Sequence, residues 1–324
     1  DLRGYIRARG AENDKCIARW LHRELTGEGD VPAPEEHPAD GIYHPDCPRD
    51  VTLEDYLSRL DPSKPVAGLL FTANSWIYGN LEHIDGLIRG LEARGMEVIP
   101  VFFSSISSKV PENDGTIRVV RRYFMDGSES RIDVMVMATP FSQLNNSRDC
   151  DGVYTPDDQN FFHTMTDVPV LQVMTVSGHF ADYEESAEGL GSGEMGINVI
   201  WPEVDGQIIT VPFASNERGR GGPKLYGPLE ERIAHIAKIA GNWADLKRTP
   251  ASERRIAVIM WQSRPETGRI GGAAGLDTIQ SIRDMLERFD DLGYTVDHVP
   301  STSRELIDEN KDNVTNDLEW SSEE

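Results

Sequence analysis

The stretch Val66-Ala-Gly-Leu-Leu-Phe-Thr72 decides the fold of this 324-residue chain. It is a short apolar run, and a stripe of apolar residues at helical spacing follows it from Leu81 to Leu91. After Gly95 a second apolar run begins, Met96-Glu-Val-Ile-Pro-Val-Phe-Phe103. A strand, a crossover helix and a second strand in this order predict a right-handed unit of a parallel sheet.

Two further apolar runs continue this pattern, Ile132 to Ala138 and Val168 to Met174. Their continuous apolar character is typical of strands that are covered on both faces of a sheet. We therefore predict an α/β domain over residues 62–228, with an open, mostly parallel, Rossmann-like sheet and flanking helices.

The residues before this domain, 1–61, are predicted to be a helical and linker segment. Apolar side chains recur at helical spacing from Cys16 to Leu25, and three prolines between Val31 and Asp40 exclude a continuous helix there. Thr52 precedes two acidic residues, which predicts a capped helix that runs to Leu60.

The residues after it, 229–324, are predicted to be a linking helix and the start of a second, truncated α/β unit. The helix is indicated by apolar spacing from Leu229 to Ala244. The strand–helix–strand order then restarts, with a strand over Arg255–Trp261, a helix over Ile279–Phe289 and a strand over Tyr294–Val299.

Charge and composition exclude several classes of protein. There are 32 basic and 55 acidic residues, so the net charge is 32 − 55 = −23, the opposite of what a nucleic-acid binder needs. No apolar run approaches the ~20 residues of a membrane-spanning helix. The cysteines, Cys16, Cys47 and Cys150, fit neither a disulfide framework nor a zinc site, which favours the cytoplasm. Whether the acidic surface serves solubility, salt adaptation or docking stays open.

The loop after the first predicted strand is the first candidate site. Asn74, Ser75 and Trp76 occupy it, and His83 follows in the crossover helix. Because open α/β sheets bind ligands at the carboxyl ends of their strands, Asn74, Ser75 and His83 are candidates for lining a cleft. The alternative for His83 is a hydrogen-bonded structural histidine.

The loop after the run ending at Met174 is the second candidate. His179 lies there near the carboxylates of Asp182, Glu184 and Glu185, so it could coordinate a divalent metal. The alternative is a solvated acidic loop.

A glycine-rich turn between Gly268 and Gly275 is the third candidate. It lacks a phosphate-loop ending and the dinucleotide glycine spacing, and Asp277 or Thr278 as a helix cap explains part of it without any ligand. Arg264 and Arg269 flank the turn and could pair with carboxylates of a substrate.

Several motifs in succession resemble one family. They are Gly41-Ile-Tyr-His-Pro-Asp46, the strand–helix–strand of residues 66–103, Trp201-Pro-Glu-Val-Asp-Gly206, Gly272-Ala-Ala-Gly-Leu-Asp-Thr278 and Leu292-Gly-Tyr294. In order and separation they resemble the large subunit of cobaltochelatase and magnesium chelatase. The chain starts without Met and the family's large subunit is several times longer, so we expect a piece of such a subunit.

The resemblance implies ATP-dependent insertion of Co²⁺ or Mg²⁺ into a tetrapyrrole, by a ligase that forms nitrogen–metal bonds. The large subunit would hold the macrocycle, AAA+ partner subunits would hydrolyse ATP, and no cofactor is assigned to this piece. The catalytic residues are expected beyond residue 324, so this piece alone is expected to be inactive. Trp76, His83, His179, Arg264 and Arg269 are expected to contribute wall positions in the complete subunit.

Two other classes stay open at this point. One is a non-catalytic tetrapyrrole-binding or scaffold module. The other is an unrelated small-molecule enzyme that uses the edge of its α/β sheet, which fold analogy alone does not exclude.

Overall fold

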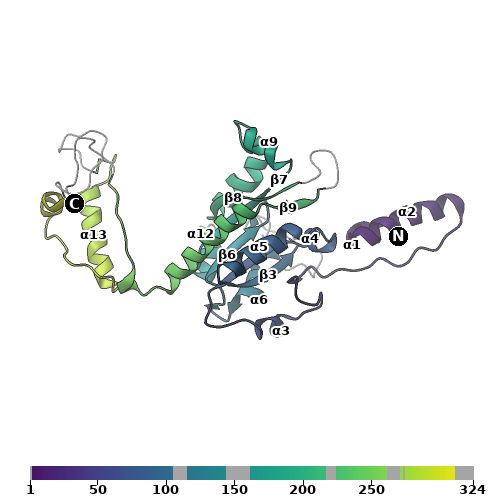
Figure 1. Ribbon diagram of the computed structural model, residues 1–324, viewed down its shortest axis with the longest axis horizontal. Helices are drawn as coiled ribbons and strands as arrows, with labels where there is room; N and C mark the ends of the chain where they lie inside the picture. Colours follow the sequence, from purple (N-terminus) through teal and green to yellow (C-terminus); the bar gives the residue numbers. More distant parts are fainter. Residues whose placement is uncertain are drawn as a thin grey trace. The chain divides into compact units, whose positions relative to one another are not determined.

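The computed structural model describes residues 2–104, 115–143, 161–216, 224–260, 271–272 and 274–310. The chain forms two compact units, residues 1–247 and 248–324 (Figure 1). We call them the first unit and the second unit.

A single large sheet forms the centre of the first unit. Among the described residues its strands lie in the order β1 (Asp40–Ile42), β3 (Glu97–Phe103), β2 (Val66–Thr72), β6 (Val134–Ala138), β7 (Val170–Val176), β8 (Ile208–Asn216) and β9 (Tyr226–Pro228). The inner strands are parallel, and the two outermost strands, β1 and β9, pair antiparallel with their neighbours. The predicted open, mostly parallel sheet is therefore confirmed. A small hairpin of β4 (Met125–Asp126) and β5 (Glu129–Ser130) stands apart from it.

Helices cover both faces of this sheet. In the described part of the first unit the helices are α1 (Leu2–Ala8), α2 (Ala11–Thr26), α3 (Leu53–Leu57), α4 (Ala73–Ile77), α5 (Glu82–Ala93), α6 (Gly115–Phe124), α8 (Phe161–Thr166), α9 (Phe180–Glu185), α10 (Ser192–Met195), the π-helix η2 (Gly196–Ile200), α11 (Trp201–Val204) and α12 (Glu230–Arg248). Side chains of α5 and α12 pack on one face of the sheet. Side chains of α3, α6 and α8 pack on the other.

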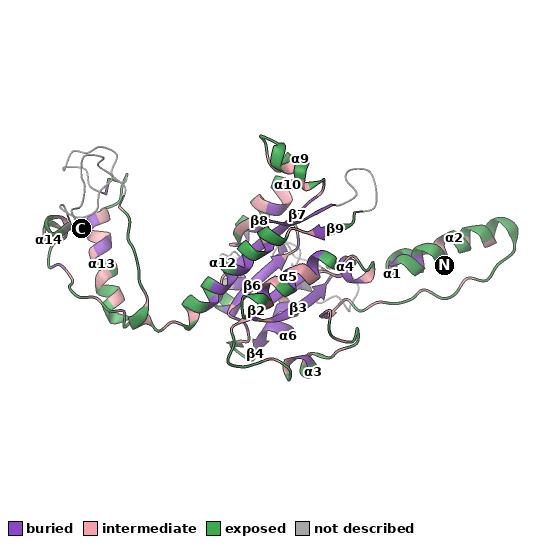
Figure 2. Cartoon of the chain, viewed as in Figure 1, coloured by how far each residue is buried: buried purple, intermediate pink, exposed green. Residues whose placement is uncertain are grey.

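Strand β2 shows why its sequence is apolar at consecutive positions. Leu69 and Phe71 point into the core beneath α5 and α12, whereas Leu70 points into the core beneath α6. All three are fully buried, and Figure 2 shows β2, β3 and β6 buried over most of their length. The strand needs apolar side chains on both faces, because neither face meets water.

Helix α12 packs closely against α5, one of the helices that cover the sheet. A Cβ atom added at Gly90 of α5 would collide with Cγ2 of Ile233 of α12. A glycine is therefore needed where the two helices meet, and the buried face of α12 belongs to the core of the first unit.

Local capping in the first unit follows the sequence. The hydroxyl of Thr52 accepts a hydrogen bond from the backbone N–H of Asp55 at 3.1 Å, which confirms the predicted cap of α3. None of the described helices is long and apolar enough to cross a membrane.

The second unit differs from its prediction. It contains a short 3₁₀ turn, η3 (Ala251–Glu253), and the helices α13 (Thr278–Asp291) and α14 (Ser303–Asn310), which share a small core of Ile279, Ile282 and Leu306. Asp277 caps α13, as predicted, by accepting from the backbone N–H of Gln280 at 3.0 Å.

The two strands predicted in the second unit are not formed in its described part. Residues 255–260 and 294–299 contain no strand, and Trp261, the last residue of the first predicted strand, lies outside the described residues. The two strand predictions are therefore wrong for these described segments, and the truncated α/β unit stays a prediction. A parallel strand needs hydrogen-bonded neighbours, and two short segments alone rarely form a stable sheet in water.

Candidate functional site

The strand order predicts where a protein of this fold binds ligands. Taken in chain order, the parallel strands are arranged 2-1-3-4-5, so the direction of winding reverses between β2 and β6. Doubly wound sheets of this kind bind ligands at the carboxyl ends of the two strands that flank the reversal. The segments at this point are α4, which follows β2, and residues 139–143, which follow β6.

The three residues predicted after β2 all lie on α4. Asn74 is exposed, and its side-chain Oδ1 accepts a hydrogen bond from Nη1 of Arg9 at 2.8 Å. Ser75 is buried. The structure thus places Asn74 and Ser75 at the reversal point, and their role as substrate contacts stays a prediction.

Trp76 is mainly a packing residue. Its ring stacks on Phe102 with a centroid distance of 4.4 Å, and the guanidinium carbon of Arg49 lies 4.3 Å from the indole centroid. Its indole N–H is buried without a hydrogen-bond partner. Trp76 therefore anchors α4 against β3, and a contact with a ligand stays a prediction.

His83 lies in the core rather than on a surface. It is 3 % exposed, with its ring 5.7 Å from that of Phe213 and 5.4 Å from that of Tyr226. Burial lowers the pKa of His83 to about 4, because the charged imidazolium would lose its hydration. His83 is therefore neutral near pH 7.

A buried polar network holds the segment after β6. Asp205 is 2 % exposed and accepts hydrogen bonds from the hydroxyl of Ser142 and from the backbone N–H of Gln143, both at 2.6 Å. The hydroxyl of Thr139 is buried and has no hydrogen-bond partner. Asp205 lies within the motif of residues 201–206, which the sequence singled out without giving it a role.

An exposed aromatic pair stands beside this network. The rings of Phe141 and Trp201 lie 5.7 Å apart, and these residues are 40 % and 47 % exposed. The backbone N–H of Phe141 donates to the carbonyl of Ile197 in the π-helix at 2.7 Å. Phe141 has a φ of 69°, a left-handed conformation that is unfavourable for a bulky residue. Strained residues and π-helices both occur preferentially at functional sites.

The segment that contains Trp201 has other exposed apolar side chains. They belong to the crossover from β7 to β8 and to the start of β8: Met195, Ile200, Val204 and Ile208. We call these residues together with Phe141 and Trp201 the aromatic shelf. Sequence reasoning missed the shelf, although the motif that begins at Trp201 was a signal for it.

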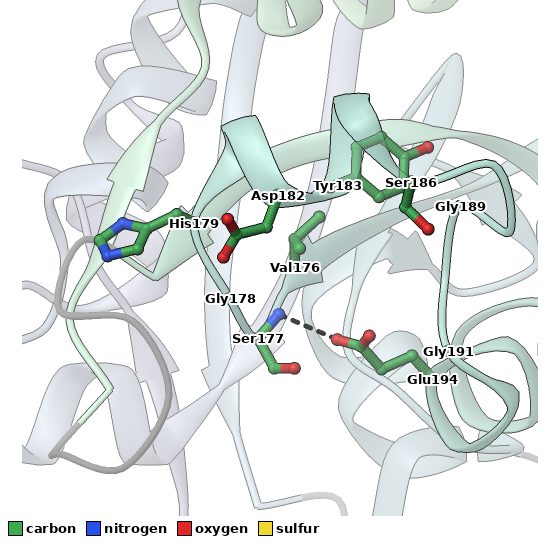
Figure 3. Close-up of a pocket in the computed structure, with 10 residues that line it drawn as sticks. All are labelled: Val176, Ser177, Gly178, His179, Asp182, Tyr183, Ser186, Gly189, Gly191 and Glu194. Carbon is green, nitrogen blue, oxygen red and sulfur yellow. Dashed lines mark hydrogen bonds between the residues drawn. The ribbon is translucent and has the colours of Figure 1, made fainter.

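His179 lines a separate, open pocket of about 100 Å³ at the end of β7 (Figure 3). The backbone N–H of Ser177 donates to Oε1 of Glu194 at 2.9 Å in this pocket, and the ring of His179 points away from Glu194. Among the described residues, His179 belongs to no set of three potential metal ligands with atoms close enough for one ion. Its role as a metal ligand stays a prediction.

The predicted arginine contacts are not described. Arg264 and Arg269 lie outside the residues that the structure describes, so their pairing with substrate carboxylates stays a prediction.

The fold defines a class: an open α/β protein whose winding reverses between two strands, a point at which proteins of this class bind ligands. Residues 3–324 match the model of the family described as CobN/Magnesium Chelatase. The chain therefore belongs to the CobN/magnesium chelatase family.

Individual relatives agree with this assignment. The chain is similar to the aerobic cobaltochelatase subunit CobN of Sinorhizobium sp, with 34 % identity over 249 residues, which are 75 % of this chain and 18 % of that protein. It is 28 % identical to the aerobic cobaltochelatase subunit CobN of Pseudomonas aeruginosa, over 97 % of this chain and 24 % of that protein.

A solved structure has the same fold. The catalytic subunit of cobaltochelatase from Mycobacterium tuberculosis matches with a TM-score of 0.63 and 22 % identity, over 95 % of this chain and 24 % of that one. The chain thus spans at most about a quarter of the length of these relatives.

Proposed function

We propose that this chain contributes to the tetrapyrrole-binding subunit of a cytoplasmic metal chelatase. The complete enzyme, a nitrogen–metal ligase, inserts Co²⁺ or Mg²⁺ into the macrocycle, and AAA+ partner subunits hydrolyse the ATP that drives insertion. Membership of the CobN/magnesium chelatase family supports the reaction class. The observation that carries the role of this chain is the exposed pair Phe141 and Trp201 at the edge of the sheet.

The aromatic shelf suits the faces of a tetrapyrrole. The macrocycle is flat and apolar over a wide area, and it gains most from aromatic rings that are already ordered. An aromatic contact contributes about 0.5–1.5 kcal/mol beyond the area that it buries. Phe141 and Trp201 provide two such rings side by side, and the shelf adds further exposed apolar side chains from the crossover to β8.

Asp205 holds the segment that follows Phe141. Its two hydrogen bonds fix Ser142 and Gln143, the residues directly after Phe141. A left-handed bulky residue costs on the order of 1–3 kcal/mol and persists only where its surroundings hold it. We assign Asp205 the role of holding the ring of Phe141 in place.

Metal insertion also needs groups that strip water from the metal ion and remove two pyrrole protons. His83 is buried in the core and Asp205 is enclosed by its donors. We therefore assign this region the binding of the macrocycle and no proton transfer.

The proposal is tested by titrating the protein with metal-free porphyrin and corrinoid precursors while following quenching of its tryptophan fluorescence. We expect saturable binding in the micromolar range, roughly −8 kcal/mol. Phe141→Ala and Trp201→Ala should each weaken binding by about tenfold, which corresponds to about 1.4 kcal/mol.

Trp243→Phe is the matched control, because Trp243 is a partly exposed tryptophan on α12 that is not part of the shelf. This variant should keep the affinity of the unchanged protein. Equal affinities for the unchanged protein and both shelf variants would contradict the assignment of the shelf.

A further inference from the structure

A cluster of three potential ligands lies in the second unit, and none of its members is among the candidates discussed so far. His298 precedes α14, and Glu305 and Glu309 stand one turn apart on that helix. One ligand atom from each of the three lies within 4.8 Å of the other two. Among the described residues, this is the set whose atoms come close enough to share one ion.

The distances within the cluster fit a shared ion. Nε2 of His298 lies 3.6 Å from Oε1 of Glu305 and 3.2 Å from Oε1 of Glu309. Zn²⁺ and similar ions hold nitrogen and oxygen ligands at about 2.1 Å, which separates neighbouring ligand atoms by about 3.0 Å in an octahedron and about 3.4 Å in a tetrahedron. Small side-chain movements would therefore complete the geometry.

One carboxylate is already oriented. The backbone N–H of Ser301 donates to Oε2 of Glu305 at 2.7 Å, and the other oxygen, Oε1, faces His298. Hydrogen bonds of this kind orient the ligands in metal sites. The side chains of His298, Glu305 and Glu309 are 53 %, 39 % and 43 % exposed, so an ion there would have access to water for its remaining positions.

The charges also favour a cation. Two carboxylates one helical turn apart repel each other, and a divalent ion between them removes this repulsion. The two ionised carboxylates carry a charge of −2, which one divalent ion balances.

We propose that His298, Glu305 and Glu309 bind a divalent transition-metal ion of the Co²⁺, Ni²⁺ or Zn²⁺ type. The imidazole nitrogen selects against Mg²⁺, which prefers an all-oxygen shell and keeps much of its water. The site does not depend on macrocycle binding. If the proposed chelatase function holds, the site places a Co²⁺-binding group on the same chain as the aromatic shelf and favours cobalt over magnesium as the inserted ion.

The test uses the full chain, free of macrocycle, titrated with Co²⁺ and followed by calorimetry and by visible absorption of the bound ion. We expect one Co²⁺ per chain at this site, and an excess of Mg²⁺ should leave the Co²⁺ spectrum unchanged. His298→Ala should weaken Co²⁺ binding at least tenfold, and Glu305→Gln combined with Glu309→Gln should do the same.

His235→Ala is the matched control, because His235 is an exposed histidine on α12 and is not a member of the cluster. It should bind Co²⁺ as the unchanged protein does, and circular dichroism should show that all variants keep their helices. The proposal is overturned if the unchanged protein binds no Co²⁺ saturably, or if the His298 and glutamate variants bind it equally well. Neither result bears on the shelf, since no macrocycle is present.

Discussion

Two regions of this molecule have the same strand–helix–strand sequence pattern and different structures. In the first unit, Leu69, Leu70 and Phe71 are fully buried within β2, which pairs with β3 on one side and β6 on the other. In the second unit, Ile256, Val258 and Ile259 are 49 %, 43 % and 93 % exposed and form no strand. The difference teaches that an apolar run becomes a strand only where other strands supply its hydrogen bonds and helices cover its faces.

The largest expected effect separates these two apolar runs. Phe71→Ala should lower the free energy of unfolding of the first unit by about 3–5 kcal/mol, because it leaves a cavity in a closed core. Ile259→Ala should change stability by less than about 0.5 kcal/mol, because the side chain is almost fully solvated. Urea denaturation followed by circular dichroism measures both. Comparable losses in the two variants would show that residues 255–260 are buried in solution and would remove the contrast.

A change of pH should affect the stability of the two units differently, because His83 belongs to the first unit. Its pKa is about 4 in the folded chain, against about 6.5 in the unfolded chain. Above pH 6.5 neither state is protonated and stability is unaffected. As the pH falls from 6.5 toward 4, His83 binds a proton in the unfolded chain but not in the folded chain. The free energy of unfolding of the first unit therefore falls by up to about 3 kcal/mol.

His83→Gln is the variant that isolates this effect. Urea midpoints at pH 7.5 and pH 4.5 should differ less in this variant than in the unchanged protein, while hydrogen exchange in α13 of the second unit should respond alike in both. An identical pH dependence with and without His83 would mean that the ring is accessible to water.

The smallest expected effect compares two helix caps, one in each unit. Asp277→Ala should destabilise α13 by about 1 kcal/mol, since it removes the acceptor for the N–H of Gln280. Thr52→Ala should destabilise α3 by a similar amount, because it removes the acceptor for the N–H of Asp55. Amide hydrogen exchange of each helix measures the loss. Because the second unit has only a small core, we expect the change at Asp277 to spread over all of α13, and protection that is lost only in its first turn would argue against this.

Much of the first unit could be predicted from sequence because its signals are local. The apolar runs of β2, β3, β6 and β7, the stripe of α5 and the cap at Thr52 can each be recognised within a dozen residues. The strands predicted after residue 254 failed for the opposite reason. The pairing of strands is not a local property, so the residues of Arg255–Trp261 do not by themselves indicate whether a neighbouring strand exists.

The candidate site was only partly predictable for the same reason. Asn74 and Ser75 follow a strand and could be placed at the sheet edge, but the winding reversal depends on β6 lying beside β2. Phe141 and Trp201 are 60 positions apart in the sequence and meet only in the folded chain. His83 is predicted to line a cleft because it follows the loop at the carboxyl edge of the sheet, and the contacts with Phe213 and Tyr226 that bury it come from strands far along the sequence, β8 and β9.

The two outer strands of the sheet have a consequence for assembly. β1 and β9 have three residues each, both run antiparallel to their neighbours, and β9 ends at Pro228, which has no N–H to donate. Short edge strands resist the addition of foreign strands, and at β9 the proline adds to this resistance. We therefore expect copies of this chain not to join through these two edges into a continuous sheet. We expect a subunit that associates with the first unit to recognise its helices and loops instead.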